Sequence, residues 1–213
     1  MNIGVLGSGV VGQTLAAGFR KHGHEVMVGT RDTLKLKAWA ANEADVKLGS
    51  SSEAAKFGEV VVLAAKGSAA AEALRGAGAV NVAGKTVIDA CNPIADAPPE
   101  KGVLRFFTDI NSSLMEALQR EFPEAKLVKA FSSVGHGQMV DPSYKAGRPT
   151  MFICGNDDAA KRTVEKLLDE FGWESADMGG VEAARAIEPL SMLWCIPGFL
   201  RNEWGHSFKL LRE

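Results

Sequence analysis

The chain has 213 residues, of which 46% are hydrophobic and 23% are charged, and its formal net charge at pH 7 is −2. This composition is ordinary for a globular protein, and the near-neutral charge implies no general attraction to nucleic acid or to an anionic membrane. No apolar stretch approaches the roughly 20 residues that span a bilayer.

The chain begins with a predicted strand that leads directly into a glycine-rich turn. The strand covers residues 2–6, and the turn has the pattern G-x-G-x-x-G, with glycines at Gly7, Gly9 and Gly12. In a dinucleotide site the first glycine permits the tight turn, and the second lets a pyrophosphate approach the backbone. The third lets the following helix pack against the strand. We therefore expect residues 7–12 to hold the pyrophosphate at the positive end of a helix.

The next residues complete a βαβ unit. Leu15 and Phe19 repeat at helical spacing, Gly23 is a helix stop, and an apolar strand follows at 25–29. The pattern over residues 2–29 is therefore much more specific than the glycines alone.

The end of this second strand distinguishes NADP from NAD. NAD enzymes place Asp or Glu there to bind the ribose hydroxyls. This chain has Thr30 and Arg31, with Lys35 about one turn later, and a hydroxyl with cations suits a 2′-phosphate. Asp32 is the competing acid, but its offset past the strand end favours a role in a turn or helix cap. The pattern predicts NADP.

Strands and helices alternate through the remainder, which predicts a doubly wound (Rossmann) α/β fold with a parallel sheet and a short C-terminal helical tail. Further strands are expected at 46–48, 60–64, 85–89, 126–130, 151–154 and 175–178. Helices are expected at 34–42, from about 51, and at 68–74, 113–122 and 157–171. Residues 95–110 and 131–150 are expected to be irregular. The domain prediction is an NADP-binding domain over 1–180 and a tail over 181–213 that completes the acceptor pocket or a dimer interface.

Several helix ends have recognisable sequence signals. Ser51 or Ser52 is expected to cap the helix near residue 51, and Ser113 begins a capping-box pattern. Asn156 or Asp157 is expected to cap the helix that follows. From Glu182 onward the tail is predicted to be helical with breaks, which are expected at Pro189, Pro197 and Gly205.

The cysteines and the N-terminus suggest the compartment. Cys91, Cys154 and Cys195 are far apart in apolar contexts and form no metal-binding spacing with the four histidines. Buried thiols are typical of a reducing compartment. Because the first strand begins at residue 2, no room is left for a signal peptide, and we expect a cytoplasmic protein without a metal.

In a sheet of this kind the ligand lies across the carboxyl ends of the strands. The turns after the first two strands should hold the adenosine side of the cofactor. The loops at 64–68, 92–93 and 132–137 should flank the nicotinamide.

These segments resemble a known family. The matching stretches are 4–12 (GVLGSGVVG), 24–31 (HEVMVGTR), 84–93 (GKTVIDACNP), 129–132 (KAFS) and 155–158 (GNDD), with 184–188 and 208–211 in the tail. Together they resemble the NADPH-dependent reductases of coenzyme F-420 (F420), a deazaflavin, and the wider group of dinucleotide-binding oxidoreductases around them. The resemblance implies NADP bound by Ser8 to Val11, Thr30, Arg31 and Lys35, an acceptor stacked over the nicotinamide, and a homodimer.

The acceptor side departs from the family pattern. The deazaflavin enzymes have a histidine where this chain has Ser132, and here His136 comes later. Their Ile-Pro-like pair after the fourth strand is replaced by Ala65 and Lys66. We therefore expect an acceptor of deazaflavin or flavin type, with the identity of that acceptor open.

The residues expected to bind the cofactor are Gly7, Ser8, Gly9, Val10, Val11, Gly12, Thr30, Arg31, Lys35, Ala65, Lys66, Asn92, Pro93, Ser133 and Val134. Hydride transfer between two bound rings needs little acid–base help. The catalytic candidates are His136, as a proton donor or acceptor contact, and Ser132, as a nicotinamide contact. An ordinary loop role is the favoured alternative for His136, and it fits Ser132 as well as the functional role does.

The tail carries residues with simpler expected roles. Arg185 and Glu188 are expected to form an ion pair within one helix, and Trp194, Phe199 and Trp204 to make core or dimer contacts. Two other functions remain open at this point. One is NADPH-dependent reduction of a small carbonyl or imine, with His136 as proton donor. The other is a non-catalytic NADP(H)-binding redox sensor.

Overall fold

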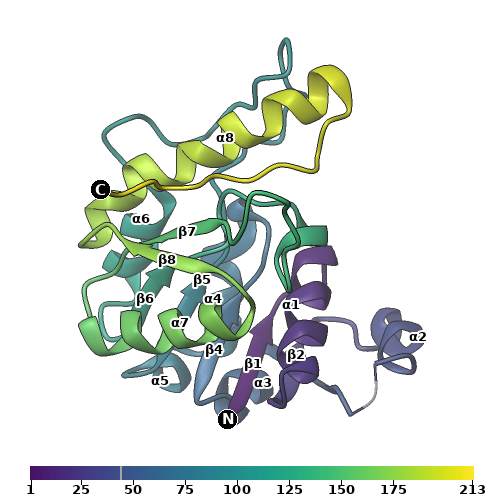
Figure 1. The fold of residues 1–213 in the computed structure, drawn as a ribbon. Helices are drawn as coiled ribbons and strands as arrows, with labels where there is room; N and C mark the ends of the chain where they lie inside the picture. Colours follow the sequence, from purple (N-terminus) through teal and green to yellow (C-terminus); the bar gives the residue numbers. More distant parts are fainter. Residues whose placement is uncertain (44) are drawn as a thin grey trace.

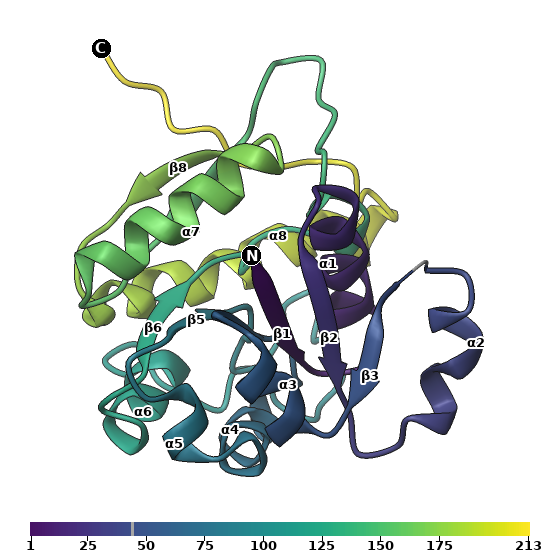
Figure 2. The same ribbon diagram turned by 90° about the horizontal axis from the view of Figure 1, so that it is seen from below.

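The computed structural model describes residues 1–43 and 45–213. Its centre is a six-stranded parallel sheet in the order β3-β2-β1-β4-β5-β6 (Figure 1, with β3 labelled in Figure 2). This is the strand order of a dinucleotide-binding fold, which confirms the predicted fold class. The strands are β1 (Asn2–Leu6), β2 (Glu25–Gly29), β3 (Lys47–Gly49), β4 (Val60–Leu63), β5 (Thr86–Asp89) and β6 (Lys126–Lys129).

Helices cover both faces of this sheet (Figure 2). The α-helices are α1 (Val10–Lys21), α2 (Lys37–Ala40), α3 (Ser51–Phe57), α4 (Ala70–Ala77), α5 (Ala79–Val82), α6 (Leu114–Glu121), α7 (Asp158–Glu170) and α8 (Ala184–Arg201). Short 3-10 turns lie at Leu34–Leu36, Gly67–Ala69, His136–Gln138 and Val181–Ala183. In the described part of the chain no helix combines the length and the apolar character needed to cross a membrane.

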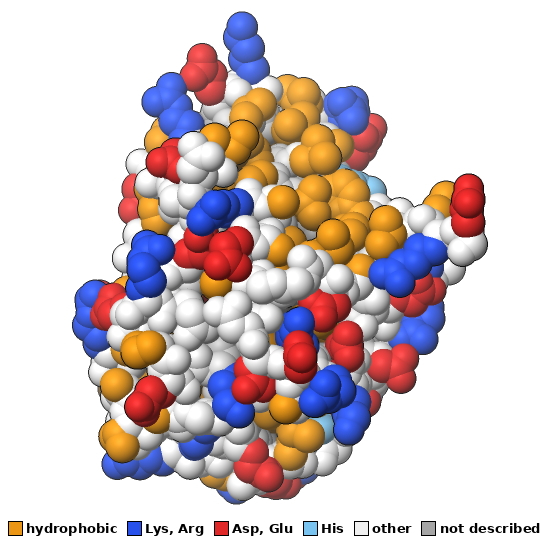
Figure 3. Space-filling model, turned by 90° about the vertical axis from the view of Figure 1, so that its left-hand side faces the viewer, with side chains coloured by type: hydrophobic (Ala, Val, Ile, Leu, Met, Phe, Trp, Pro, Cys, Tyr) orange, Lys and Arg blue, Asp and Glu red, His pale blue; other side chains and the backbone are white. Residues whose placement is uncertain are grey.

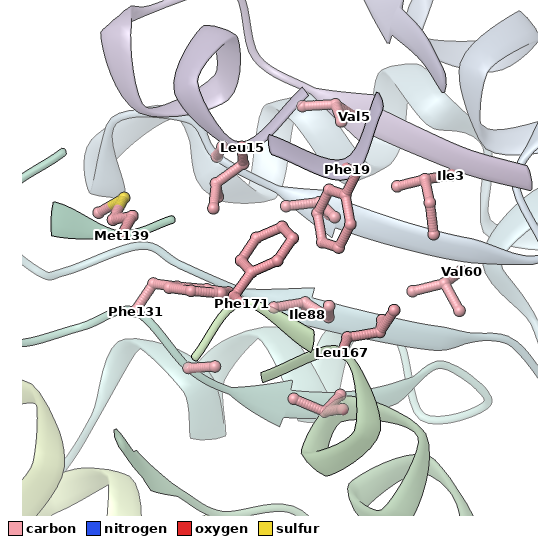
Figure 4. Close-up of a cluster of buried hydrophobic side chains, with 14 of the residues drawn as sticks. Ile3, Val5, Leu15, Phe19, Val60, Ile88, Phe131, Met139, Leu167 and Phe171 are labelled. Atoms are coloured by element: carbon pink, nitrogen blue, oxygen red, sulfur yellow. The ribbon is translucent and has the colours of Figure 1, made fainter. Parts of the chain in front are cut away.

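The sheet is buried on both faces because successive side chains of its strands point to opposite sides. In β4, Val60 and Val62 pack with α1 and α7, whereas Val61 and Leu63 pack with α3, α4 and α6. Figure 4 shows the first of these two cores, where Phe19 of α1 lies against Phe171 after α7 with 4.7 Å between ring centroids. The two cores hold the sheet rigid, so its carboxyl edge is a fixed platform for the loops.

The last two strands form a sheet of their own. β7 (Thr150–Ile153) and β8 (Glu174–Asp177) pair in parallel, and the pair joins the main sheet through an antiparallel bridge between Lys129 and Cys154. The sequence predicts both strands within one residue of their ends. It does not predict this antiparallel attachment, because strand direction depends on the route of the loop at 131–149.

The tail differs from its prediction. α8 is continuous through Pro189 and Pro197, so the expected breaks there are wrong. A proline inside a helix removes one backbone hydrogen bond, and here the burial of side chains such as Ile187 and Trp194 offsets that loss. The helix ends at Arg201, where Asn202 adopts a left-handed conformation with φ of 56°.

Residues 202–213 are not helical, which also corrects the prediction. They run back beside α8 as an extended segment (Figure 1). The Thr150 N–H donates to Phe208 O at 2.9 Å, and the Leu210 N–H donates to the Thr150 hydroxyl at 3.0 Å. The segment is therefore attached to the start of β7.

The helix caps are confirmed in two of three cases. Ser113 and Asp157 accept hydrogen bonds from backbone N–H groups of the first turns of α6 and α7. The cap of α3 is Ser50, not Ser51 or Ser52, because Ser50 forms a reciprocal capping box with Glu53. The predicted helix at 34–42 is a 3-10 turn followed by the short α2, and α5 was not predicted.

Candidate functional site

The turns that follow β1, β2 and β4 surround a pocket of about 580 Å³ at the carboxyl edge of the sheet. Seven of the residues expected to bind the cofactor line it: Gly7, Ser8, Gly9, Thr30, Arg31, Ala65 and Lys66. The structure therefore brings together three turns that are far apart in the sequence, at the edge where dinucleotides bind in such folds.

The three glycines of the first turn differ in why a side chain is absent at each position. Gly7 has φ of +135°, and a Cβ there would lie 2.3 Å from the Ala64 carbonyl oxygen. A Cβ on Gly12 would lie 2.2 Å from the Gly7 oxygen, so Gly12 allows α1 to start close to β1. A Cβ on Gly9 would meet nothing within 4 Å. The packing explains Gly7 and Gly12, whereas Gly9 faces open space.

Gly9 is also the N-cap of α1, and no side chain caps that helix or places a carboxylate in its first turn. The first N–H groups of a helix have no partner within it and carry partial positive charge. Gln13 steadies the turn by donating from Nε2 to the Ser8 carbonyl oxygen at 2.8 Å. Open space above Gly9, N–H groups without partners inside the helix, and the lack of a carboxylate in the first turn of α1 fit a pyrophosphate.

The turn after β2 is organised around Thr30. Its hydroxyl donates to Ser8 Oγ at 3.2 Å and accepts from the Asp32 N–H at 3.2 Å. Asp32 in turn accepts the Leu34 N–H through Oδ1 at 3.0 Å, which confirms its expected role in the turn. Lys35 Nζ lies 3.8 Å from Asp32 Oδ2. Thr30 and Arg31 line the pocket, whereas Lys35, in the 3-10 turn Leu34–Leu36, is not part of its lining.

Two charged residues of α4 join the pocket and were not predicted. Glu72 lies beside Arg31, and Arg75 donates to both carboxylate oxygens of Glu121, at 2.6 and 2.9 Å. Their positions depend on how α4 packs beside the turn after β2, and no local sequence signal marks them. With Lys66, the pocket has three cationic side chains and one carboxylate at its border.

The loops after β5 and β6 are joined by a reciprocal pair of hydrogen bonds. The Asn92 amide donates to the Ser132 carbonyl oxygen at 2.9 Å, and the Ser132 hydroxyl donates to Asn92 Oδ1 at 2.6 Å. Ser132, Ser133, Val134 and Pro93 are buried. The Ser132 hydroxyl therefore ties the two loops together.

Two further candidates on the nicotinamide side, His136 and Lys66, are exposed. His136 begins the short 3-10 turn after β6, and within the described residues its side chain forms no hydrogen bond or ion pair. Lys66 forms an ion pair with Asp96, which lies in the irregular segment after β5. His136 therefore follows Ser132 closely in the chain, but its side chain has no partner among the described residues. Lys66 links the loop after β4 to the segment after β5.

Two expectations for α8 are resolved by its packing. The predicted ion pair between Arg185 and Glu188 is wrong, because each side chain pairs with a residue of another element. The Arg185 guanidinium lies 2.5 Å from Glu116 Oε1, whereas Glu188 faces Lys129. Trp194 is a buried core residue that stacks on His206 at 5.2 Å.

The cysteines are unpaired, and two of them are buried. Burial raises the pKa of the Cys91 thiol well above its ordinary value, and it raises that of Cys154 to about 12. Cys195 is half-buried. Across residues 1–43 and 45–213 no three His, Cys, Asp or Glu side chains are grouped so that they could hold a metal ion.

Comparison with known proteins points to one group of enzymes. Residues 2–93 match the family described as NADP oxidoreductase coenzyme F420-dependent. The F420-dependent NADP reductase of Methanocaldococcus jannaschii is 28% identical over 205 residues, covering 91% of this chain and 90% of that protein. The metalloreductase STEAP3 of Rattus norvegicus is 29% identical over 202 residues, but the chain spans only 38% of its length.

A solved structure agrees along the whole chain. A crystal structure from Arthrobacter sp. FB24, which carries a provisional assignment as an F420-dependent NADP reductase, superimposes with a TM-score of 0.92. It is 35% identical, and the match covers 100% of both chains. The chain is an NADP-dependent oxidoreductase and belongs to the coenzyme F420-dependent NADP oxidoreductase family.

Proposed function

We propose that this protein transfers a hydride between NADPH and a deazaflavin ring of the F420 type. In the reducing direction NADPH gives up a hydride, the acceptor takes up that hydride and one proton from solvent, and NADP⁺ is released. The nicotinamide and the acceptor supply the redox chemistry when bound. The protein's part is to bind and orient them.

The binding part of the proposal uses the pocket described above. The turn at residues 7–12 would hold the pyrophosphate, and Thr30, Arg31 and Lys35 would surround the 2′-phosphate. Ala65, Lys66, Asn92, Pro93, Ser133 and Val134 would border the nicotinamide half. Their places at the carboxyl ends of β4, β5 and β6 support this assignment.

One observation carries the choice of acceptor. The Ser132 hydroxyl donates to Asn92, and the exposed His136 imidazole has no partner among the described residues. Reduction of a carbonyl or imine needs a positioned proton donor within hydrogen-bond reach. Hydride transfer between two stacked rings depends more on how the rings are oriented than on acid–base help. The loops at the carboxyl edge of the sheet would orient the two rings.

Single-turnover oxidation of NADPH, followed at 340 nm with F420, FMN and a series of small carbonyls and imines, tests the proposal. We expect rapid oxidation with F420 and an unchanged rate in His136→Ala. Carbonyl or imine turnover that disappears in His136→Ala would establish the other reductase activity instead. Tight NADPH binding with no oxidation by any acceptor would favour a redox sensor.

A homodimer is part of the same proposal. Hydrophobic side chains gather on the upper part of one face, in the region of α8 and the tail (Figure 3). Two aromatic residues of this part of the chain, Phe199 and Trp204, are 44% and 39% exposed. Light scattering after gel filtration would report a mass near twice 22.6 kDa for a dimer.

A further inference from the structure

Three charged side chains meet inside the protein, away from the pocket. Lys129 ends β6 and is fully buried, and its Nζ lies 2.6 Å from Asp89 Oδ2 and 2.9 Å from Glu188 Oε1. Asp89 and Glu188 are also buried, and they come from β5 and α8. The cluster therefore joins two neighbouring strands of the sheet to the C-terminal helix.

The cluster binds both backbone polar groups of Cys91, which lies just after β5. The Cys91 N–H donates to Asp89 Oδ1 at 2.9 Å, and Lys129 Nζ donates to the Cys91 carbonyl oxygen at 2.8 Å. The next residue is Asn92, which is joined to Ser132. Cys91 is thus held by the charged side chains of Asp89 and Lys129, and Asn92 is held by Ser132 in the loop after β6.

Glu188 extends the cluster to a further helix. Its Oε2 accepts the Leu114 N–H and its Oε1 accepts the Met115 N–H, both at 3.0 Å, at the start of α6. A carboxylate at a helix N-terminus is favourable because it meets unpaired N–H groups and partial positive charge. The positions of α6, α8 and the loop after β5 are therefore coupled through one carboxylate and one ammonium group.

Fold stability alone does not explain this cluster. Burial lowers the pKa of Lys129, but the carboxylates of Asp89 and Glu188 outweigh that effect and hold its pKa above the ordinary value. The three groups carry a formal charge of −1 in an apolar interior. Removing ions from water is so unfavourable that apolar replacements of whole buried clusters are often neutral or stabilising. Apolar side chains could fill the same space, but they could not form the hydrogen bonds that hold the loop after β5.

We propose that Lys129, together with Asp89 and Glu188, is a positioning group that fixes the loop at residues 91–93 for the nicotinamide half of the cofactor. None of the three touches the pocket that borders the adenosine half. Their effect on the cofactor is therefore expected only at the end of the dinucleotide that meets the loops after β5 and β6. This inference rests on the binding part of the proposed function and is independent of the acceptor.

Glu188→Gln is the main test because it keeps the shape of the side chain and removes its charge. The matched control is Glu116→Gln, which breaks the ion pair to Arg185, also between α6 and α8, without touching the loop after β5. Asp89→Asn is a second test variant, since its remaining oxygen can still accept the Cys91 N–H.

Isothermal titration with NADPH and with 2′,5′-ADP separates the two halves of the site. We expect Glu188→Gln and Asp89→Asn to weaken NADPH binding by fivefold or more and to leave 2′,5′-ADP binding within twofold. The blue shift of NADPH fluorescence on binding should shrink in the same variants. Glu116→Gln should change neither affinity, even where it lowers the melting temperature equally.

Unchanged NADPH binding in the folded variants would overturn the proposal. A parallel loss for NADPH and 2′,5′-ADP, or the same split in Glu116→Gln, would also overturn it, because these results indicate general loosening. No acceptor is present in these titrations. Failure of F420 to oxidise bound NADPH would therefore count against the proposed function and not against this inference.

Discussion

Arg31 and Glu72 form an ion pair at the border of the pocket, with 3.4 Å between Nη1 and Oε1. Their side chains are 87% and 67% exposed, so the pair lies in solvent and both partners can rearrange. The pair links the turn after β2 to α4. A 2′-phosphate that binds to Arg31 therefore has to compete with the Glu72 carboxylate.

Replacing Arg31 tests its proposed contact with the 2′-phosphate. A hydrogen bond to a charged group contributes about 1.5–3 kcal/mol. Since tenfold in affinity corresponds to roughly 1.4 kcal/mol, Arg31→Ser should weaken NADPH binding by about 10- to 100-fold. NADH binding should change little. Arg105→Ser, at an exposed ion pair with Glu100 outside the pocket, is the control. Equal losses for NADPH and NADH would contradict the assignment.

Neutralising Glu72 should have the opposite effect. Exposed ion pairs contribute about 0.2–1 kcal/mol, and Glu72→Gln also removes a negative charge from the pocket. We expect NADPH to bind up to about fivefold more tightly at low salt, with the gain shrinking at high salt because exposed charges are screened. Fluorescence titrations at two ionic strengths would measure this. Weaker binding in the variant would mean that Glu72 itself contacts the cofactor.

Gly9 and Gly7 should respond differently to alanine. Gly9→Ala meets no protein atom within 4 Å, so the melting temperature should stay within about 2 °C while NADPH affinity falls. Gly7→Ala should lower the melting temperature because its Cβ would clash with Ala64 and its φ is positive. Gly205→Ala, which also meets nothing within 4 Å, is the control for Gly9. Normal NADPH binding by Gly9→Ala would show that the pyrophosphate does not approach this turn.

The thiols should differ in reactivity. Burial raises the pKa of Cys91, Cys154 and Cys195, but Cys195 is only half-buried. Because the thiolate is the reactive form, an aromatic disulfide reagent at pH 8 should modify Cys195 first and slowly. The other two thiols should react only after unfolding in guanidinium. Mass spectrometry of the labelled peptides would identify the order, and early modification of Cys91 would contradict the packing.

The pair of Glu116 and Arg185 predicts a loss of stability in acid. Hydrogen bonds from Arg185 lower the pKa of Glu116 in the folded state. A carboxyl group with a lowered folded pKa contributes stability above its unfolded pKa of about 4.3, and this contribution is lost as pH falls through the folded value. Denaturant unfolding should therefore show a smaller difference between wild type and Glu116→Gln at pH 3 than at pH 7. A difference that grows in acid would reverse the sign and contradict the prediction.

The glycine turn and the alternation of strands and helices could be predicted because they depend on nearby residues. Gly7 is needed for its own backbone conformation, and the apolar run of β4 reflects burial on both faces. Ser113 and Asp157 cap helices that begin at the next residue. Each of these features follows from stereochemistry or periodicity within a few positions, and the family resemblance rests on the same segments.

Most of the wrong predictions concern contacts between segments that are distant in the sequence. The cap of α3 is the exception, because it was missed although its cause is local: Ser50, and not Ser51 or Ser52, forms the capping box with Glu53. The continuity of α8 through Pro189 and Pro197 depends on what its faces pack against. Arg185 turns to Glu116 although Glu188 is only three residues away, because the helix places them against different elements.

Short sequence patterns, each with a local physical cause, were enough to predict the doubly wound fold, the dinucleotide turn and NADP as the cofactor. Which side chains meet depends on how distant segments pack. The tertiary structure placed Glu72 opposite Arg31, tied Ser132 to Asn92, and buried Lys129 between Asp89 and Glu188. These contacts join residues 40 to 59 positions apart. The packing of helices on the sheet selects them, and no local pattern can specify them.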